Sequence, residues 1–478
     1  MTFVVIAVFW CIFLYSFVAP IHRIVYLIMC SICFGTFSTI PTSVTGFVFL
    51  PAPLFALALV MRVALAPNAP QFIITSVLVP RRMLLLFLFL VVAYITTLFM
   101  PRLFAGGIDV VTFRGRVDTT VPLRPTPQNL SQLFYVTISV FSVVAFAFIL
   151  RKPVMRQHAL KAVWWGGVFT VATGVLDYLN SFLPLDPLLA PFRTASYALA
   201  TDVALLGGKR VVGLTSEASA FGNICIAFAL TLYFFRRAID DQRLRDVWAP
   251  ILIVMLVGMV WLSKSTGAYV ILCIAFALAG LDWLLRAARG RKRSRVTTGI
   301  GTEFWLAFGG VMSVLLVLLT NPAVFEPIYA LFERLVLNKA ESTSFEERGM
   351  WRLTAWTAFL DSSLFGVGVG STRASSAVVS TFASTGLIGA LFYYGFLLQT
   401  ALRKAPPGSV DGPIIVVGFR WWIIPGLFVG LFVGTVDFGI FNAFVLGLVT
   451  AVGTTRMAQP LRAEGITPRS RLPASRPS

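Results

Sequence analysis

The chain alternates between long apolar stretches and short polar connections over almost its whole length. A membrane-spanning α-helix needs about 20 apolar residues, and many of the stretches approach that length. The segment 66–80 is shorter and carries prolines near both ends, which is equally compatible with an interfacial helix. The pattern predicts an all-α, polytopic membrane bundle of about 12–14 transmembrane helices. The predicted spans are 3–19, 24–40, 44–61, 83–100, 130–150, 162–180, 220–235, 249–263, 267–285, 303–320, 384–402, 419–435 and 437–455.

Composition supports this assignment and excludes an ordinary soluble enzyme. Apolar residues make up 58% of the chain and charged residues only 12%, with a mean hydropathy of +0.86. A soluble domain has roughly 25% charged residues. We therefore expect a single membrane-embedded domain over residues 1–455. The segment 456–478 is rich in Arg, Pro and Ser, which predicts a disordered, basic cytoplasmic tail.

The formal net charge of +19 invites a nucleic-acid interpretation, but the distribution of the charges argues against it. The basic residues form short clusters between apolar spans, as the positive-inside rule predicts for cytoplasmic loops. We expect these clusters to orient the helices, with contact to anionic membrane lipid as a further alternative and no nucleic-acid partner. The main clusters are Arg81-Arg82, 151–161, 236–245, 286–295 and Arg403-Lys404.

The alternation of basic connections leaves three longer segments on the opposite face, 101–129, 181–219 and 321–383. The last is the largest, and we expect it to be the largest soluble element of the chain. The side of the N-terminus stays open. Neither a metal nor a cofactor is expected, because the five cysteines lie in apolar spans without metal-ligand spacing and the chain has only two histidines.

Arg210 and Glu217 lie in the polar segment 209–221, which leads into a predicted span at the outer membrane edge. A lone carboxylate at a helix start can simply favour the positive end of the helix dipole. The alternative is a catalytic or substrate-binding role, which the neighbouring Arg210 strengthens. Asp177 and Asp437 lie inside or near spans, so they are further candidates.

Lys264 and Ser265 interrupt two predicted spans in the segment S-K-S-T-G. A lysine at a hairpin tip on the outer face departs from the positive-inside pattern. Lysines near helix ends often snorkel to the interface without any further role. The flanking serines, threonine and glycine suggest instead a tight turn whose donors are aimed at one point.

A charged helix is predicted to start near Ser344, because Ser344 and Glu347 fit the S-x-x-E capping box. Arg348 and Arg352 are four residues apart, so both guanidinium groups project from one helix face, where they are suited to gripping phosphate oxygens. The alternative is that both arginines balance nearby acids in surface ion pairs, which contribute ~0–1 kcal/mol.

A glycine-rich turn, Phe365 to Ser371, follows this helix. It is either a plain turn or an anion nest of backbone amides, in which Gly368 would contact the substrate. Arg373, just after the turn, is a further candidate for substrate binding. A second glycine series predicts a helix-packing face and consists of Gly426, Gly430 and Gly434.

Several of these segments resemble, in the same order, motifs of the bacterial O-antigen ligase and polysaccharide polymerase superfamily. SEASAFG, with Arg210 upstream, resembles the Arg…Ser-Glu-Pro-Ser element, and WLSKSTGAY is similar to the Ser-x-(Ser/Thr)-Gly hairpin. ERGMWRLTAWTAFLDSSLFGVGVGS resembles the Arg-x-x-x-Trp…Pro-x-x-Gly-x-Gly region, and STFASTGLIGALFYYGFL resembles the closing Leu-x-x-x-Gly-x-x-Gly helix. The resemblance covers about residues 205–400.

The chain departs from the family pattern at three places. Ala218 replaces the usual proline after the glutamate, and Ser362-Ser363 stands where the family often has Asn-Pro. The stretch 375–380 lacks the histidine that the ligase branch places before the closing helix. That missing histidine favours a polymerase over a ligase.

The resemblance implies a GT-C-like membrane enzyme of the bacterial inner membrane, with a large periplasmic loop over residues 321–383. Such an enzyme joins polyprenyl-diphosphate-linked oligosaccharide repeat units without a metal. Chain-length regulator and flippase proteins are implied as candidate partners. Glu217 would act as general base on the acceptor hydroxyl, and the diphosphate would be held by Arg210, Arg348 and Arg352. The remaining implied contacts to the diphosphate or sugar are Lys264, Ser265, Gly368 and Arg373.

Two other classes remain open beside the O-antigen ligase. A transporter or flippase of lipid-linked oligosaccharide would place charges along a central cavity with broken helices. A structural membrane scaffold would have no chemistry. Convergence of the candidate residues at one outer site favours the transferase, and scatter favours a rival.

Overall fold

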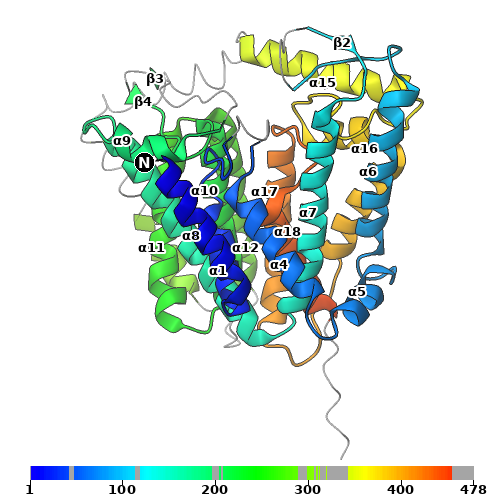
Figure 1. Ribbon diagram of the computed structural model, residues 1–478. Coiled ribbons are helices and arrows are strands. Elements are labelled where there is room, and N and C mark those ends of the chain that lie inside the picture. The colour runs from blue at the N-terminus through cyan, green and yellow to red at the C-terminus, as the bar shows by residue number, and fades with distance from the viewer. Residues whose placement is uncertain are drawn as a thin grey trace, which may run out of the picture.

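The structure of the protein, a computed structural model, describes residues 2–41, 48–113, 119–195, 204–205, 208–288, 299–305, 308–309, 312, 319 and 343–454. Within these residues the chain is almost entirely helical, and its strands form two short antiparallel hairpins. The long helices run side by side between two ends of one bundle (Figure 1).

The helices are α1 (Thr2–Val18), α2 (Ile21–Ser31), α4 (Pro51–Ala64), α5 (Ala69–Val77), α6 (Leu84–Leu103), α7 (Pro127–Ile149), α8 (Pro153–Leu179), α9 (Asp186–Leu189), α10 (Ala218–Phe235), α11 (Ala249–Ser263), α12 (Thr266–Ala288), α15 (Thr343–Asp361), α16 (Ala377–Ala401), α17 (Gly412–Gly430) and α18 (Gly439–Thr454). Short 3₁₀ or π turns are η1 (Ala190–Phe192), η2 (Arg236–Ala238) and η3 (Leu244–Trp248). The strands β1 (Asp109–Val110) and β2 (Val121–Pro122) pair with each other, as do β3 (Ala204–Leu205) and β4 (Gly208–Lys209).

Eight helices of the described chain are long and apolar enough to cross a membrane: α6, α7, α8, α10 with η2, η3 with α11, α12, α16 and α17. The protein is therefore an all-α, multi-pass membrane protein in class. The helices α1, α2 and α18 are apolar but shorter. The expected span 24–40 is too long, because α2 ends at Ser31 and turns follow. Most of the expected span 303–320 lies outside the described residues.

The helices α4 and α5 form a bent pair with an angle of 106° between them. Asn68 stands at the break with a left-handed backbone, at a φ of 63°. The structure thus places a separate short helix within the segment 66–80, at a steep angle to its neighbour, which fits an interfacial helix, a broken span or a re-entrant loop alike.

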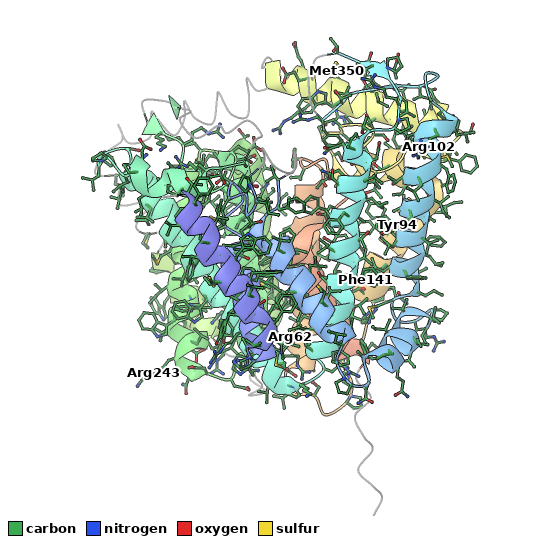
Figure 2. The ribbon with its side chains drawn as sticks, viewed as in Figure 1. Arg62, Tyr94, Arg102, Phe141, Arg243 and Met350 are labelled. Atoms are coloured by element: carbon green, nitrogen blue, oxygen red, sulfur yellow. The ribbon has the colours of Figure 1, made fainter. Side chains whose placement is uncertain are left out.

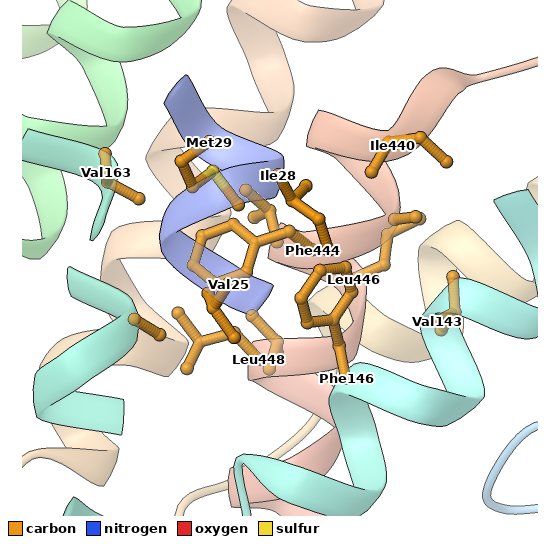
Figure 3. Close-up of a cluster of buried hydrophobic side chains, with 14 of the residues drawn as sticks. Val25, Ile28, Met29, Val143, Phe146, Val163, Ile440, Phe444, Leu446 and Leu448 are labelled. Carbon is orange, nitrogen blue, oxygen red and sulfur yellow. The ribbon is translucent and has the colours of Figure 1, made fainter. Parts of the chain in front are cut away.

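The apolar core lies where α2, α7, α8 and α18 meet (Figure 3). Phe146 of α7 and Phe444 of α18 contact edge to face, with ring centroids 5.4 Å apart. Gly447 permits this close approach, because a Cβ atom there would lie 2.5 Å from the Cβ of Phe146. The packing of these helices therefore depends on a small residue opposite a large one.

The second glycine series does not form the expected continuous packing face. The helix α17 ends at Gly430, so Gly434 lies in the following connection. A Cβ atom at Gly434 would meet the backbone of Ala374, whereas one at Gly426 would have no neighbour within 4 Å. The close approach is thus between two loops, and Gly426 is not part of it.

Charged side chains from the basic clusters form buried ion pairs. Arg156 binds Asp411 through two contacts of 2.5 and 2.9 Å, which joins the start of α8 to the connection before α17. Asp282 of α12 accepts hydrogen bonds from Arg237 at 3.0 Å and Arg286 at 2.8 Å. Because burying an unpaired charge is costly, removal of one partner from either ion-pair group would destabilise the bundle.

The segments between the spans divide between the two ends. The hairpins β1–β2 and β3–β4 lie at the end that carries α9 and α15 (Figure 1), so the described parts of the three longer segments lie at one end of the bundle, as expected. Met350 and Arg102 also lie there, whereas Arg243 lies at the opposite, basic end (Figure 2). Of the largest segment, residues 321–342 lie outside the described chain, as does the tail 455–478.

Candidate functional site

Arg210 and Lys264 meet at the outer end of α11. The N–H of Val211 donates to the carbonyl of Leu262 at 3.1 Å, and the Nε–H of Arg210 donates to the carbonyl of Ser263 at 3.3 Å. Lys264 follows as the left-handed cap of α11, with a φ of 46°. Burial lowers the pKa of Lys264, and the charge of Arg210 lowers it further. The hairpin between α11 and α12 therefore brings two cations together, as the sequence predicts.

Ser265 has a local structural role in this hairpin. Its side chain is buried, and its hydroxyl oxygen lies 3.5 Å from the backbone nitrogen of Ala268 in the first turn of α12. This contact supports the start of the helix, and a substrate contact of Ser265 stays a prediction.

Asp177 of α8 fixes the backbone that carries Arg210. Its carboxylate is fully buried and accepts the N–H groups of Val212 at 2.7 Å and Gly213 at 3.1 Å. Arg193 at 2.7 Å and Lys209 at 3.0 Å balance its charge. Asp177 is thus a positioning residue, and Lys209 is committed to it. The sequence offered only one hint, an acid inside a predicted span.

Glu217 is the N-cap residue of α10, but its side chain makes no capping hydrogen bond to the helix backbone. The side chain is exposed, and its carboxylate accepts a hydrogen bond from the hydroxyl of Ser219. Burial lowers the pKa of Arg210, and the nearby Glu217 carboxylate opposes that effect. The Glu217 carboxylate therefore lies within electrostatic reach of Arg210 and makes no capping hydrogen bond to the helix end.

Arg373 links this group to α15. Its guanidinium lies 3.9 Å from the ring centre of Trp351. Burial lowers the pKa of Arg373, Glu217 and Glu347 oppose that effect, and Arg348 adds to it. Arg373 therefore lies within electrostatic reach of both Glu217 and Arg348. The site residues Arg210, Glu217, Lys264, Arg348 and Arg373 are hereafter called the outer charge cluster.

No hydrogen bond, ion pair or cation–π contact among the described residues links the Arg352 side chain to the outer charge cluster. Arg352 is exposed one helical turn after Arg348, and neither arginine forms an ion pair with another described residue. The backbone of Arg348 is tied to the loop before α16, because the hydroxyl of Ser375 donates to its carbonyl at 2.7 Å. Of the two arginines, only Arg348 is thus linked to the outer charge cluster, and the two guanidinium groups are not equivalent.

The glycine-rich turn packs against α6 and α16, which favours the plain turn over the anion nest. The N–H of Gly368 donates to the carbonyl of Ser384 in α16 at 3.1 Å, and the N–H of Val369 donates to the hydroxyl of Thr97 in α6 at 3.0 Å. Gly368 is buried at a φ of 90°, where a Cβ atom would lie 3.0 Å from the carbonyl oxygen of Thr96. Its amide is therefore satisfied by protein and unavailable to a phosphate.

Asp437 stands apart from the outer charge cluster. Its half-buried carboxylate accepts hydrogen bonds from the hydroxyl of Ser139 at 2.5 Å and the N–H of Gly439 at 3.0 Å. Burial raises the pKa of this carboxyl group. Asp437 lines a small polar cavity together with Thr372 and Ser380. Thr372 directly precedes Arg373, so the loop that carries Arg373 forms part of the cavity wall.

The outer charge cluster combines four cations with one exposed carboxylate. Such a set can hold an anionic leaving group and accept a proton from a neighbouring hydroxyl. No group of three or more His, Cys, Asp or Glu side chains in the described chain is arranged to hold a metal ion. No family model, no curated protein and no solved structure matches this chain.

Proposed function

We propose that the protein is a polymerase that joins polyprenyl-diphosphate-linked oligosaccharide repeat units into a surface polysaccharide. The observation that carries the proposal is the outer charge cluster, in which residues from four separate parts of the sequence meet at one end of the bundle. An enzyme that releases a lipid diphosphate at the membrane edge needs such a group of fixed cations. A transporter would instead need charges along a central cavity.

The reaction follows from the charges. A hydroxyl oxygen of the acceptor sugar forms a bond to the anomeric carbon of the donor, and the bond from that carbon to the diphosphate oxygen breaks. Glu217 takes the proton of the hydroxyl, because its carboxylate is the exposed acid of the cluster. Arg210 and Lys264 stabilise the negative charge that the departing polyprenyl diphosphate acquires. Arg348 and Arg373 would hold the other side of the diphosphate.

The proposed orientation puts the outer charge cluster in the periplasm of a bacterial inner membrane. The buried and exposed arginines of the opposite end then face the cytoplasm, as the positive-inside rule requires. Flippase and chain-length regulator proteins would deliver the substrate and limit its length. A GT-C-like arrangement is part of the same proposal.

A complementation assay tests the proposal. A strain that lacks the gene would carry the Glu217→Gln or Arg373→Ala variant, and its surface polysaccharide would be resolved by length on a gel. We expect single repeat units in place of polymer, because loss of a general base alone slows a reaction about 10²–10⁴-fold. Arg102→Ala is the matched control, since Arg102 is exposed at the same end but outside the cluster.

Full-length polymer in both cluster variants, at normal protein levels, would overturn the proposal. Accumulation of lipid-linked repeats on the cytoplasmic side would point to transport instead. Accumulation of full-length polymer that is not attached to its final acceptor would point to a ligase.

A further inference from the structure

A second cation-lined site lies at the basic end of the bundle, far along the helices from the outer charge cluster. A cavity of about 850 Å³ lies between the bent pair α4–α5 and the connection from α7 to α8. Arg82, Arg151 and Lys152 line it, and none of its lining residues is acidic. Phe72 and Phe148 provide an apolar wall. The volume is within the range of small-molecule sites, roughly 300–1,000 Å³.

Two of the three cations of this cavity, Arg151 and Arg82, are held by contacts with the protein. The guanidinium of Arg151 lies 4.2 Å from the ring centre of Phe72 and 4.6 Å from that of Phe148. Its Nε–H donates to the carbonyl of Phe148 at 3.1 Å. Arg82 donates to the carbonyl of Thr75 at 3.1 Å, which ties it to α5. Both arginines therefore keep further N–H groups for a ligand in a fixed geometry.

Like charges crowd this region without a matching carboxylate in the cavity wall. Burial lowers the pKa of Arg151, and Arg82 lowers it further. Arg403 is buried behind Arg82, to whose carbonyl it donates, and burial with the charge of Arg82 lowers its pKa to about 10. Its Nε and Nη1 atoms have no hydrogen-bond partner among the described residues. Arg403 does not line the cavity, but its charge adds to the positive potential there, which a bound anion would offset.

The short helix α5 indicates where that anion comes from. It lies at 106° to α4 and exposes the apolar side chains of Ile74 and Leu78, at 58% and 57%. A short helix at this angle, with exposed apolar side chains at the end of a bundle, fits a place in the membrane interface. In that place the cavity would be at the depth of lipid headgroups, with an aromatic wall beside its cations.

We propose that this cavity binds the phosphate headgroup of an anionic membrane lipid. The phosphate oxygens accept hydrogen bonds from Arg82, Arg151 and Lys152, and the glycerol backbone with the first acyl carbons packs on Phe72 and Phe148. Basic pockets between membrane helices on the cytoplasmic side bind anionic lipids in this way. The inference does not depend on the proposed polymerase activity.

Native mass spectrometry of the purified full-length protein in detergent tests the site. The probe is dioleoyl phosphatidylglycerol, with dioleoyl phosphatidylcholine as the uncharged comparison. We expect Arg151→Gln with Lys152→Gln to weaken phosphatidylglycerol binding roughly 30-fold, because each basic residue near an anionic surface contributes about 1 kcal/mol. The matched control is Lys161→Gln with Arg243→Gln, which removes the same charge from the same end outside the cavity. The control should bind as the parent protein does.

A second arm separates a lipid from a free phosphate and guards against misfolding. Phe148→Ser should weaken phosphatidylglycerol binding without changing the weak binding of inorganic phosphate. Arg151→Lys retains the charge that Arg151→Gln removes. It should therefore bind phosphatidylglycerol more tightly than the double variant, provided that the double variant is folded. Equal loss in both double variants, equal binding of the two lipids, or full competition by millimolar inorganic phosphate would each overturn the proposal.

Discussion

The guanidinium of Arg373 lies 3.9 Å from the ring centre of Trp351, so a cation after the glycine-rich turn rests on an aromatic side chain of α15. Trp351 is buried, which keeps its ring in place below the cation. The contact orients Arg373. The charges of Glu217 and Arg348 also affect the pKa of its guanidinium group. The contact with Trp351 thereby couples α15 to the outer charge cluster.

Replacement of Trp351 tests that coupling. Trp351→Leu should lower polymer formation roughly 2- to 30-fold, because a cation–π contact contributes about 0.5–2 kcal/mol. Trp351→Phe retains an aromatic face and should recover most of the activity. The measurement is polymer length in the complemented strain at matched protein levels. Equal activity of the leucine and phenylalanine variants would show that the ring only fills space.

Asp177→Asn should destabilise the folded protein by about 3–5 kcal/mol, because it leaves Arg193 and Lys209 buried without their counter-charge. It also loosens the backbone that carries Arg210. The measurement is thermal unfolding of the purified protein in detergent. Asp186→Asn is the control, since Asp186 is exposed and its replacement should change stability by less than about 0.5 kcal/mol. A small effect at both positions would contradict the positioning role of Asp177.

Asp437 should make stability depend on pH. Its pKa is raised by burial, so the folded protein retains the proton at pH values where the unfolded chain has lost it. Stability is therefore highest at low pH and falls as pH rises from the ordinary carboxyl range through the raised pKa. Melting temperatures in detergent across pH 4–8, roughly the range bracketing carboxyl titration, measure this slope. Asp437→Asn should flatten it.

Ser139→Ala provides the matched variant for that pH dependence. The Ser139 hydroxyl donates to the Asp437 carboxylate and lowers its pKa, opposing burial. Loss of this donor should move the fall in stability to higher pH, with no such fall in the double variant that also carries Asp437→Asn. An unchanged slope in Asp437→Asn would show that another group titrates.

Gly434→Ala should sharply reduce the yield of folded protein, because the added Cβ atom would overlap the backbone of Ala374. The atoms that the added Cβ would meet belong to the backbone, which cannot rotate away as a side chain can. The two loops must therefore separate. Gly426→Ala is the control, since its Cβ atom would have no neighbour within 4 Å. Size-exclusion chromatography of the detergent-solubilised variants measures the yield, and a monodisperse Gly434→Ala protein would contradict the close approach.

The glycine series illustrates the limit of pattern reading. Equal spacing of Gly426, Gly430 and Gly434 predicts one helix face, but α17 ends before Gly434. Spacing along a sequence has a meaning in space only while the helix continues. The same reason applies to Gly368, whose flexible backbone is visible in the sequence while the carbonyl of Ser384 that satisfies its amide is not.

The sequence alone determined the membrane class, the alternation of basic connections and the end at which the longer segments gather, because these follow from local hydropathy and charge. It also pointed to Arg210, Glu217, Lys264, Arg348 and Arg373, since charged residues make up only 12% of the chain. Only the tertiary structure decided which charges are paired, as for Asp177 and Arg156. Ion pairing is set by distances between segments far apart in the chain, and hydropathy carries no record of those distances.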